Sequence, residues 1–296
     1  MPQLEEYGAQ PPIELLRLLV DKGFLYDRKE RFQKFIENVT LLCCSAPPGG
    51  GRNPLTPRFT RHFNMLSLPQ PAQATLFKIF FSILNGFFGQ GFTDAVRKMS
   101  DTITNATIEV YTRIIKEKLP IPSKFHYTFN LRDVSKVFQG VLMVKPGLVR
   151  EVDQVTRLWV HEVSRVFYDR LINEIDREWF KELVADLLAR QFKSRMTKDD
   201  IYGANKVLYG DLLKIDSDNR EYEEIKDMNK LIKILEDKLD DYNTECNSKT
   251  RLVFFSDAID HVLRISRILR QPRGNAMLIG VGGSGKQSLT RLSAFM

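Results

Sequence analysis

Apolar residues recur at steps of three and four along most of this chain, which is the spacing of one face of an α-helix. The pattern is longest in residues 92–118, where it predicts an amphipathic helix that ends before Pro120. The same spacing predicts helices over residues 13–20, 72–88, 152–175, 179–192, 225–242 and 254–269, and from Asn130 toward Pro146. Short apolar runs predict strands over residues 39–44, 207–209 and 276–279. The pattern therefore predicts an α/β chain that is predominantly helical.

Four details of this pattern carry further expectations. Residues 225–242 resemble a coiled-coil seam, but the run is short, so an ordinary packed helix is predicted rather than a dimer. His161 falls off the apolar face of its helix and is expected on the surface. Residues 26–34 are charged and are expected to be irregular. The polar stretch after Phe192 predicts a domain boundary near residue 195.

The composition is that of a globular protein with a mild positive charge. The 296 residues are 43% hydrophobic and 27% charged, and the formal net charge is +7. This charge suits a phosphate ligand or an acidic protein partner. Lysines and arginines are scattered among acidic residues, whereas a nucleic-acid site needs a denser basic stripe. We therefore expect no nucleic-acid partner.

Cysteines and apolar runs narrow the class further. The chain has three cysteines, of which Cys43 and Cys44 are adjacent, so neither a disulfide framework nor metal-ligand spacing is present. Both are expected to be small buried residues of a protein in a reducing compartment. The most apolar run, residues 77–88, is too short to cross a bilayer, and residues 1–12 do not resemble a signal peptide. We expect no membrane partner.

The last part of the chain has the pattern of a phosphate-binding loop. Residues 276–288 have the sequence AMLIGVGGSGKQS, in which an apolar run leads into a glycine-rich turn, a lysine and a helical pattern. In such a loop backbone N–H groups surround a polyphosphate, and the N-terminus of the following helix adds a favourable dipole. The predicted cofactor-binding residues are Gly280, Gly282, Gly283, Ser284, Gly285, Lys286, Gln287 and Ser288. We expect the loop to bind ATP or ADP, with Lys286 at the terminal phosphates, provided that the rest of its domain is present.

The residue after the lysine departs from the usual motif. The motif places Ser or Thr there, and its hydroxyl binds Mg²⁺. Here Gln287 occupies that position, and Ser288 follows about 100° further around the helix. We therefore expect nucleotide binding to be retained better than hydrolysis. The alternative, a glycine turn without a ligand, is disfavoured by the apolar run before it and the helical pattern after it.

Hydrolysis also needs an acidic residue at the end of a later strand, which holds Mg²⁺ and orders water. Only ten residues follow Lys286, too few for such a strand. We expect an incomplete nucleotide site in this chain.

Two other places suggest contacts with an anion. The predicted strand 39–44 runs into the breaker-rich residues 47–54, which form either a ligand-contacting loop or a plain surface turn, and Arg58 and Arg61 follow at the same edge. Asn130 is a predicted N-cap, so Arg132 lies in the first turn of a helix, where the dipole disfavours a cation. Arg132 therefore either meets an anionic partner or is simply solvated.

Four blocks, taken with the phosphate-binding loop, resemble the dynein heavy chains, and the axonemal members more than the cytoplasmic ones. The blocks are APPGGGRNPLTPRF followed by RHFN (residues 46–59 and 61–64), HYTFNLRD (126–133), LWVHE (158–162) and RISRILRQPRGN (264–275). Their order resembles the passage from the third to the fourth AAA+ module of the motor ring. The resemblance covers nearly the whole chain.

The resemblance implies partial AAA+ P-loop NTPase modules with a helical lid subdomain. It assigns residues 1–70 to the end of the third module's large α/β subdomain, 71–195 to that module's helical lid, and 196–296 to the start of the fourth module.

The resemblance also implies roles for individual residues. Arg58 and Arg61 are candidates for an arginine finger, and Arg132 for the second sensor of the third module's nucleotide. Ala46 stands where AAA+ proteins carry a polar sensor, but its side chain offers no donor. Lys286 matches the P-loop lysine of the fourth module.

The implied function is a part of an ATP-dependent, minus-end-directed microtubule motor of cilia and flagella. Its implied cofactors are ATP or ADP and Mg²⁺. Its implied partners are the remaining AAA+ modules of the ring, dynein intermediate and light chains, and microtubules, in the cytoplasm, the cytoskeleton and the ciliary axoneme. The alternative is a catalytically silent helical fragment or interaction protein, which would show no ATPase activity of its own.

Overall fold

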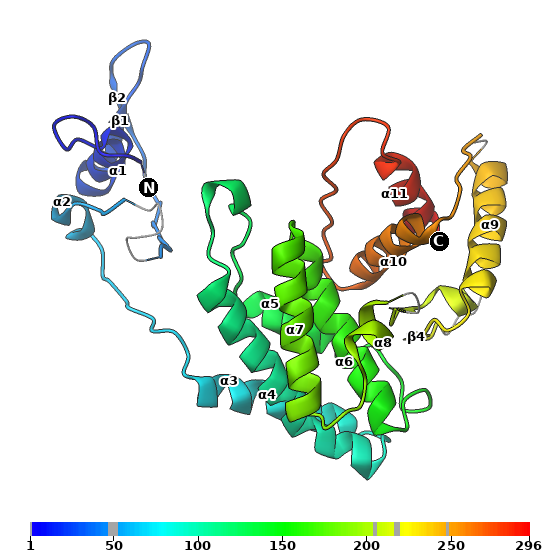
Figure 1. Cartoon of the computed structure of the whole chain (residues 1–296). Coiled ribbons are helices and arrows are strands. Elements are labelled where there is room, and N and C mark those ends of the chain that lie inside the picture. The colour runs from blue at the N-terminus through cyan, green and yellow to red at the C-terminus, as the bar shows by residue number, and fades with distance from the viewer. Residues whose placement is uncertain (1, 47–52, 204–205, 216–219, 247–248) are drawn as a thin grey trace. The chain divides into compact units, whose positions relative to one another are not determined.

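The structure is a computed structural model that describes residues 2–46, 53–203, 206–215, 220–246 and 249–296. It is predominantly helical and divides into two compact units, residues 1–70 and 71–296, which are described separately (Figure 1). In the described ranges no helix is both long and apolar enough to cross a membrane.

The described residues of the first unit form two helices and one hairpin. Its elements are α1 (Pro11–Lys22), β1 (Phe24–Tyr26), β2 (Gln33–Phe35) and α2 (Pro57–Thr60). Helix α1 ends at Gly23, whose φ of 75° lies in the left-handed region and whose N–H donates to the Leu19 carbonyl. The predicted end of this helix is confirmed. The prediction that residues 26–34 are irregular is wrong at both ends, because Tyr26 pairs with Gln33 in an antiparallel hairpin.

Residues 39–44 do not form the predicted strand. Leu42 is 91% exposed, and Cys43 and Cys44 are exposed as well, so the expectation that the two cysteines are buried is also wrong. A strand needs a neighbour that accepts and donates its ladder hydrogen bonds, and none of the described strands pairs with this segment. The breaker loop predicted to follow it lies mostly at residues 47–52, outside the described residues.

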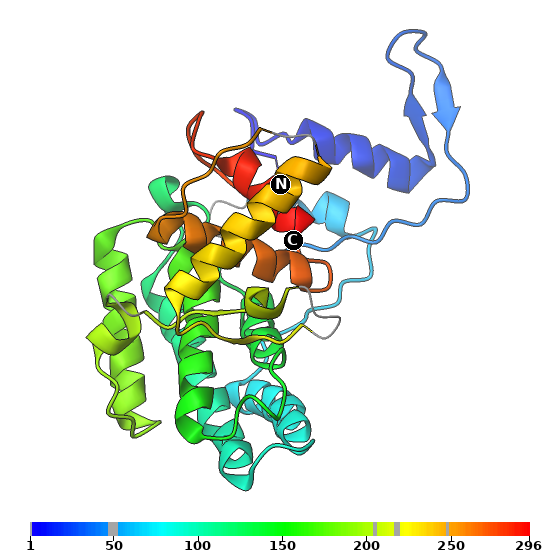
Figure 2. The same ribbon diagram turned by 90° about the vertical axis from the view of Figure 1, so that its right-hand side faces the viewer.

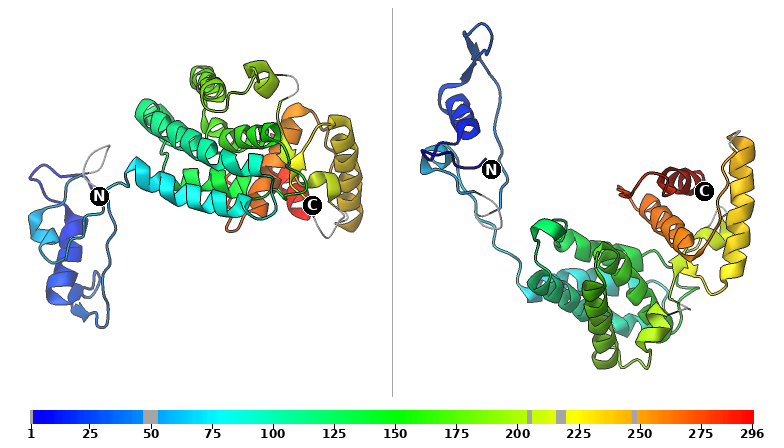
Figure 3. Two further views of the ribbon diagram at one scale, coloured as in Figure 1. Left: turned by 90° about the horizontal axis from the view of Figure 1, so that it is seen from below. Right: turned by 45° about the horizontal axis from the view of Figure 1, so that its top comes forward.

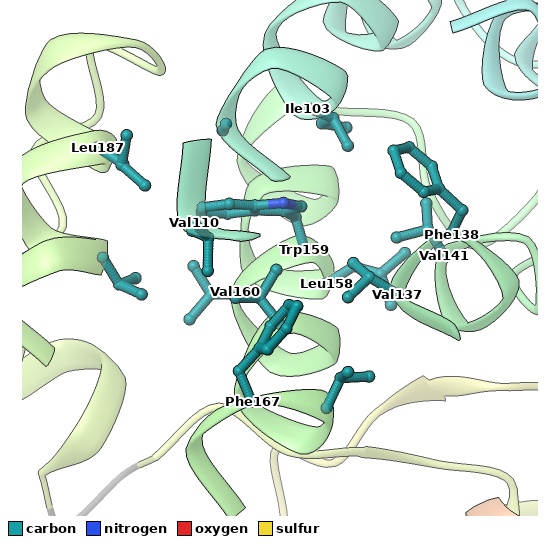
Figure 4. Packing of buried hydrophobic residues seen from close by; sticks show 14 of the residues in the cluster. Ile103, Val110, Val137, Phe138, Val141, Leu158, Trp159, Val160, Phe167 and Leu187 are labelled. Carbon is teal, nitrogen blue, oxygen red and sulfur yellow. The ribbon is translucent and has the colours of Figure 1, made fainter. Parts of the chain in front are cut away.

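The second unit begins with a bundle of helices around one apolar core. Its main helices are α3 (Gln73–Phe88), α4 (Asp94–Glu117), α5 (Leu131–Val141), α6 (Val152–Val166) and α7 (Glu174–Arg190), with a short 3₁₀ turn η1 (Pro122–Lys124) between α4 and α5. Trp159 of α6 is fully buried among side chains of the neighbouring helices (Figure 4). Its indole Nε1 donates to Thr107 Oγ1 of α4 at 2.9 Å, so its single polar atom is satisfied inside the core. The predicted stripes are core faces.

The helix predicted over residues 152–175 ends early, and the break predicted between it and the helix over 179–192 lies at residues 167–173 instead. Helix α6 ends at Val166, a 3₁₀ turn η2 (Tyr168–Arg170) follows, and α7 starts at Glu174. Asn173 caps α7 by accepting a hydrogen bond from the Asp176 N–H at 3.0 Å. The asparagine cap stabilises the start of α7, so a new helix begins there although the apolar spacing of the sequence gives no sign of a break at that point.

The second unit continues into smaller elements, of which the last three helices surround a second buried cluster and the first packs on the first core through Ile201. They are α8 (Lys198–Tyr202), β3 (Tyr209–Gly210), η3 (Leu212–Lys214), β4 (Glu223–Glu224), α9 (Met228–Glu245), α10 (Ser256–Arg270) and α11 (Lys286–Phe295). Helix α9 lies beside α11, and α11 beside α10 (Figures 2 and 3). Leu231, Leu235 and Leu239 bury one face of α9, which confirms the prediction of an ordinary packed helix. Of the strand predicted over 207–209, only Tyr209 lies in a strand, the short β3, which pairs with β4.

Residues 276–279, predicted as the strand before the phosphate-binding loop, are not a strand. Figure 1 shows this stretch as part of an open loop between α10 and α11. Met277 and Ile279 are more than 80% exposed, while Leu278 contacts the second cluster. As with residues 39–44, no strand in the described part of the chain lies beside it to complete a ladder.

Both buried clusters lie within one compact unit. The first cluster runs from Leu76 to Tyr222 and the second from Leu208 to Leu292, so they overlap in sequence. The predicted domain boundary near residue 195 stays a prediction.

Candidate functional site

The phosphate-binding loop is built on glycines that adopt conformations other residues avoid. Gly283 has φ 77° and Gly285 has φ 75°, both in the left-handed region, where a Cβ would be strained. Gly285 is also the N-cap residue of α11, so the helix begins at Lys286. The local backbone is therefore the turn from loop to helix that the sequence predicted.

Lys286 folds back over this loop. Its Nζ donates hydrogen bonds to the carbonyl oxygens of Gly280 and Val281, both at 2.6 Å, and to Ser284 Oγ at 3.0 Å. The loop thus holds its own ammonium group at the centre of the turn, which is where a cation must lie to meet a bound phosphate.

The loop residues suit the phosphates of a nucleotide better than they suit its Mg²⁺ ion. The glycine turn, Lys286 and the N-terminus of α11 together suit an anion. Gln287 is exposed and Ser288 is half-buried, so the position that normally supplies the Mg²⁺-binding hydroxyl carries an amide instead. Across the described ranges there is no group of three or more His, Cys, Asp or Glu side chains arranged for a metal ion.

Arg132 stands at the N-terminus of α5, at the position that the sequence predicted. Asn130 accepts a hydrogen bond from the Arg132 N–H at 2.9 Å, and Asp133 accepts one from the Asn130 N–H at 2.9 Å, which completes a capping box. The Arg132 side chain is exposed. The backbone there is therefore fixed while the guanidinium remains accessible.

Arg170 holds this helix start and was missed by the sequence analysis. Its guanidinium donates to Asp133 Oδ2 at 3.0 Å and to the His126 carbonyl at 2.8 Å, and it lies over the Phe129 ring. A buried Asp133 needs a positive partner, but nothing in the local sequence says that the partner lies 37 residues later.

A second carboxylate, Asp176, ties the loop before α5 to α7. It accepts hydrogen bonds from Lys118 Nζ at 3.0 Å, Lys124 Nζ at 2.6 Å and the Tyr127 hydroxyl at 2.9 Å. Burial alone would raise the pKa of Asp176, but the bonds from Lys124, Lys118 and Tyr127 outweigh it and lower the pKa. The HYTFNLRD segment is thus anchored at both ends.

Arg58 and Arg61 belong to the first unit. Arg58 lies on the four-residue α2 and Arg61 directly follows it, and both are exposed, while Phe59 between them is buried. Arg61 Nε donates to His62 Nε2 at 3.4 Å. The structure places the P-loop and Arg132 in the second unit, so these arginines and the P-loop belong to different units.

A buried ion pair joins α6 to α10. Glu162 is fully buried and pairs with Arg267, which is 8% exposed, and the Tyr222 hydroxyl donates to Glu162 Oε1 at 2.6 Å. Burial opposes the charge on Arg267, but Glu162 and Tyr222 together raise its pKa. A Cβ on Gly140 of α5 would collide with Glu162, so α5 approaches the pair closely because residue 140 is glycine.

His161, beside this pair, is buried rather than exposed. It is 3% exposed, and its Nδ1 lies 3.2 Å from the Val207 carbonyl oxygen. The sequence predicted a surface residue because His161 falls off the stripe that faces the first core. That side of α6 is covered by Val207, Tyr209 and Tyr222, which come from the later part of the chain.

Comparisons with known families match the chain in three places. Residues 1–71 match the family model "P-loop containing dynein motor region", residues 103–203 the "AAA+ lid domain", and residues 250–296 the "P-loop containing dynein motor region D4". The helical bundle and the glycine loop are therefore parts of AAA+ modules, which confirms the predicted fold class.

Relatives cover nearly the whole chain. It is 49% identical to dynein axonemal heavy chain 6 of Homo sapiens over 99% of the chain, and 46% identical to dynein axonemal heavy chain 1 of Mus musculus over 100% of it. The chain belongs to the axonemal dynein heavy chain family, and the predicted resemblance is confirmed. It spans about 7% of the length of each of these two relatives.

Proposed function

We propose that this chain is a nucleotide-binding part of an ATP-dependent, minus-end-directed microtubule motor of cilia and flagella. The observation that carries the proposal is the position of Lys286, held by Gly280 and Val281 at the centre of a glycine turn that starts a helix. The relatives are dynein heavy chains, and that family supplies the motor context for such a loop.

The proposed ligand is ATP or ADP at residues 280–288. The glycine turn and the start of α11 would receive the phosphates, and Lys286 would release its loop carbonyls to pair with the terminal ones. When bound, the nucleotide supplies the negative phosphate charge that would pair with Lys286 and with the N-terminus of α11. With Gln287 in the hydroxyl position, Mg²⁺ is expected to contribute less than in other P-loops.

The three arginines are assigned roles in the same proposal. Arg132 is proposed as a second sensor, because a fixed helix start with an exposed guanidinium suits a phosphate. Arg58 and Arg61 are proposed to face the nucleotide of a neighbouring module, and their exposure is compatible with that role.

The proposed domain limits follow the family. Residues 1–70 would end the third module's large subdomain, 71–195 would form its lid and 196–296 would begin the fourth module.

The proposed partners and place follow from the motor context. They are the remaining AAA+ modules of the ring, dynein intermediate and light chains, and microtubules, in the cytoplasm, the cytoskeleton and the ciliary axoneme.

Nucleotide binding tests the proposal directly. Fluorescent ATP and ADP analogues would be titrated into the purified chain and into Lys286→Ala, with Arg291→Ala as a matched control on the exposed side of α11. Loss of a charged phosphate contact is expected to weaken binding about tenfold or more, while Arg291→Ala binds as the parent does. Equal affinity of the parent and Lys286→Ala would refute the assignment.

The alternative, a silent helical fragment or interaction protein, is separated by ATPase activity and binding together. We expect the 296-residue chain to bind nucleotide without steady-state turnover above background. If the chain showed neither nucleotide binding nor ATP turnover, the result would favour the alternative. Turnover that Lys286→Ala abolishes would show instead that the chain is a complete ATPase.

A further inference from the structure

The antiparallel hairpin of β1 and β2 leaves its β2 edge open. Figure 2 shows the hairpin projecting from the C-terminal end of α1. All three residues of β2, Gln33, Lys34 and Phe35, are exposed, and among the described residues β2 pairs only with β1. An exposed edge strand presents backbone groups that another extended polypeptide can bond.

The two ends of the hairpin fix its hydrogen-bond pattern. The Asp27 N–H donates to the Phe32 carbonyl at 2.9 Å. The Ile36 N–H donates to the Gly23 carbonyl, also at 2.9 Å. Because hydrogen-bonded pairs alternate with unbonded pairs in an antiparallel ladder, every second residue of β2 bonds inward to β1 and the residues between face outward.

Gln33 and Phe35 are the outward-facing residues. By the alternation Lys34 bonds inward to its partner Leu25, whereas Gln33 and Phe35 direct their N–H and carbonyl groups to the outer edge. Neither of the two appears in a backbone hydrogen bond to a loop or turn of the described ranges. The edge therefore offers two donors and two acceptors to an added strand.

The side chains of the hairpin differ between its two faces. Phe35 lies opposite Phe24 with ring centroids 5.6 Å apart, and the Phe24 and Tyr26 rings are 5.4 Å apart. Tyr26 is 53% exposed and Phe35 is 65% exposed. Lys34 points to the other face, because successive side chains of a strand alternate. One face is thus aromatic, and the other carries a cation at the open edge.

The hairpin also has an excess of cations. Residues 24–35 contain two carboxylates, Asp27 and Glu30, against four cations, Arg28, Lys29, Arg31 and Lys34. The Asp27 carboxylate accepts hydrogen bonds from the Lys29 N–H at 2.8 Å and the Glu30 N–H at 3.0 Å, so it holds the turn. The ion pairs among the described residues of the first unit lie outside the hairpin. This charge favours an acidic partner.

The edge and the charge together define the partner. A second copy of the chain would bring two Lys34 side chains close together, and like charges in neighbouring strands are destabilising. A phosphate backbone accepts hydrogen bonds but donates none to the outward carbonyl groups, whereas a peptide does both. We infer that the outer edge of β2 binds an extended acidic segment of another polypeptide as a third strand, with carboxylates beside Lys34 and apolar side chains beside Phe35. The inference does not depend on nucleotide binding at residues 280–288.

Fluorescence anisotropy with a labelled peptide tests this edge. The probe is a fluorescein-labelled peptide of about eight residues in which Glu and Val alternate, so that its carboxylates share one face when it is extended. Its control has the same composition with all Glu residues before all Val residues. The full chain is expected to bind the alternating peptide saturably and at least about fivefold more tightly than the control, because only the alternating peptide matches both faces.

A change in the peptide backbone tests strand pairing without altering the protein. The alternating peptide methylated on its backbone nitrogens keeps every charge and side chain but cannot donate backbone hydrogen bonds. We expect it to bind at least about tenfold more weakly.

Two substitutions in β2 locate the binding. Gln33→Pro removes one outward N–H and keeps the inward bonds, so it should weaken the alternating peptide about fivefold. Lys34→Glu should weaken that peptide and strengthen a peptide in which Lys and Val alternate. Lys98→Glu, on the exposed side of α4, makes the same change of charge and should alter neither affinity. Thermal unfolding of each variant checks that it is folded.

Four results would overturn the inference. The first is no saturable binding of the alternating peptide up to about 1 mM. Equal affinity for the alternating, rearranged and methylated peptides would mean unspecific attraction by the cations. Unchanged binding by a folded Lys34→Glu would place the peptide elsewhere. A dimer of the chain that Gln33→Pro dissociates in sedimentation would show that a second copy occupies the edge.

Discussion

The P-loop segment and the contact between α6 and α10 lie in the same compact unit, yet their side chains are fixed in opposite ways. In the first, Met277 and Ile279 are exposed, and Lys286 donates its hydrogen bonds among the described residues to its own loop. In the second, Glu162 and Arg267 are buried and come from positions 105 residues apart. The P-loop depends on local sequence, and the helix contact depends on packing.

This difference indicates which region contributes to the stability of the fold and which is free to bind a ligand. A buried ion pair is costly to break, because the remaining charge has no water to solvate it. Lys286 is only half-buried, so water can take over the hydrogen bonds to the loop carbonyls when the lysine is removed. We therefore expect substitutions in the α6–α10 contact to change stability, and substitutions in the P-loop to change ligand binding.

The largest effect is expected from Glu162→Ala. It leaves the Arg267 guanidinium and the Tyr222 hydroxyl without their acceptor, which should lower the free energy of unfolding by about 3–5 kcal/mol. Urea unfolding measures this, with Glu236→Ala on the exposed side of α9 as the control. Lys286→Ala should stay within about 0.5 kcal/mol of the parent. If Lys286→Ala destabilised as much as Glu162→Ala, the contrast between the two regions would be wrong.

A smaller effect is expected from Gly140→Ala. The new methyl group would meet the Glu162 carboxylate and the Arg267 guanidinium, so α5 must shift away from the pair. Forced overpacking of this kind costs about 1–3 kcal/mol. Urea unfolding of Gly140→Ala beside Gly86→Ala, where nothing lies within 4 Å of the added Cβ, isolates the collision. A Gly140→Ala protein as stable as the parent would show that the contact is loose.

The smallest effect concerns pH and Asp176. Its folded-state pKa is lowered below 3.8, so the folded protein holds this proton more weakly than the unfolded chain. The carboxylate therefore stabilises the fold above that pH, and the contribution is lost as the pH falls through the folded-state pKa. The difference in unfolding free energy between the parent and Asp176→Asn should be steady near neutral pH and shrink below about pH 4.

Unfolding curves over that pH range for the parent, Asp176→Asn and the exposed-site control Asp186→Asn measure this difference. A difference that grows in acid would mean that burial, and not the two lysines and Tyr127, determines the pKa of Asp176.

Helices were predicted well because their signals are local. The N-cap at Asn130, the glycine end of α1 at Gly23 and the apolar face of α9 all depend on residues within a few turns. The break between α6 and α7 was predicted too late in the chain, because the apolar spacing continues past Val166 while Asn173 starts a new helix.

Strands and buried polar residues were predicted poorly because their partners are distant in sequence. Residues 39–44 and 276–279 have apolar strand-like composition, but a strand exists only when a second strand completes its hydrogen bonds. His161 was expected on the surface because the pattern of its own helix cannot reveal what covers the opposite face.

The sequence by itself determined the helices, the glycine turn that presents Lys286, and the family, because each depends on residue types at short and fixed spacings. Only the tertiary structure decided that Glu162 meets Arg267 and that Arg170 holds the start of α5. Those contacts join residues far apart in the chain, and their energies depend on burial. Burial is a property of the packed molecule, so the order of residues does not reveal it.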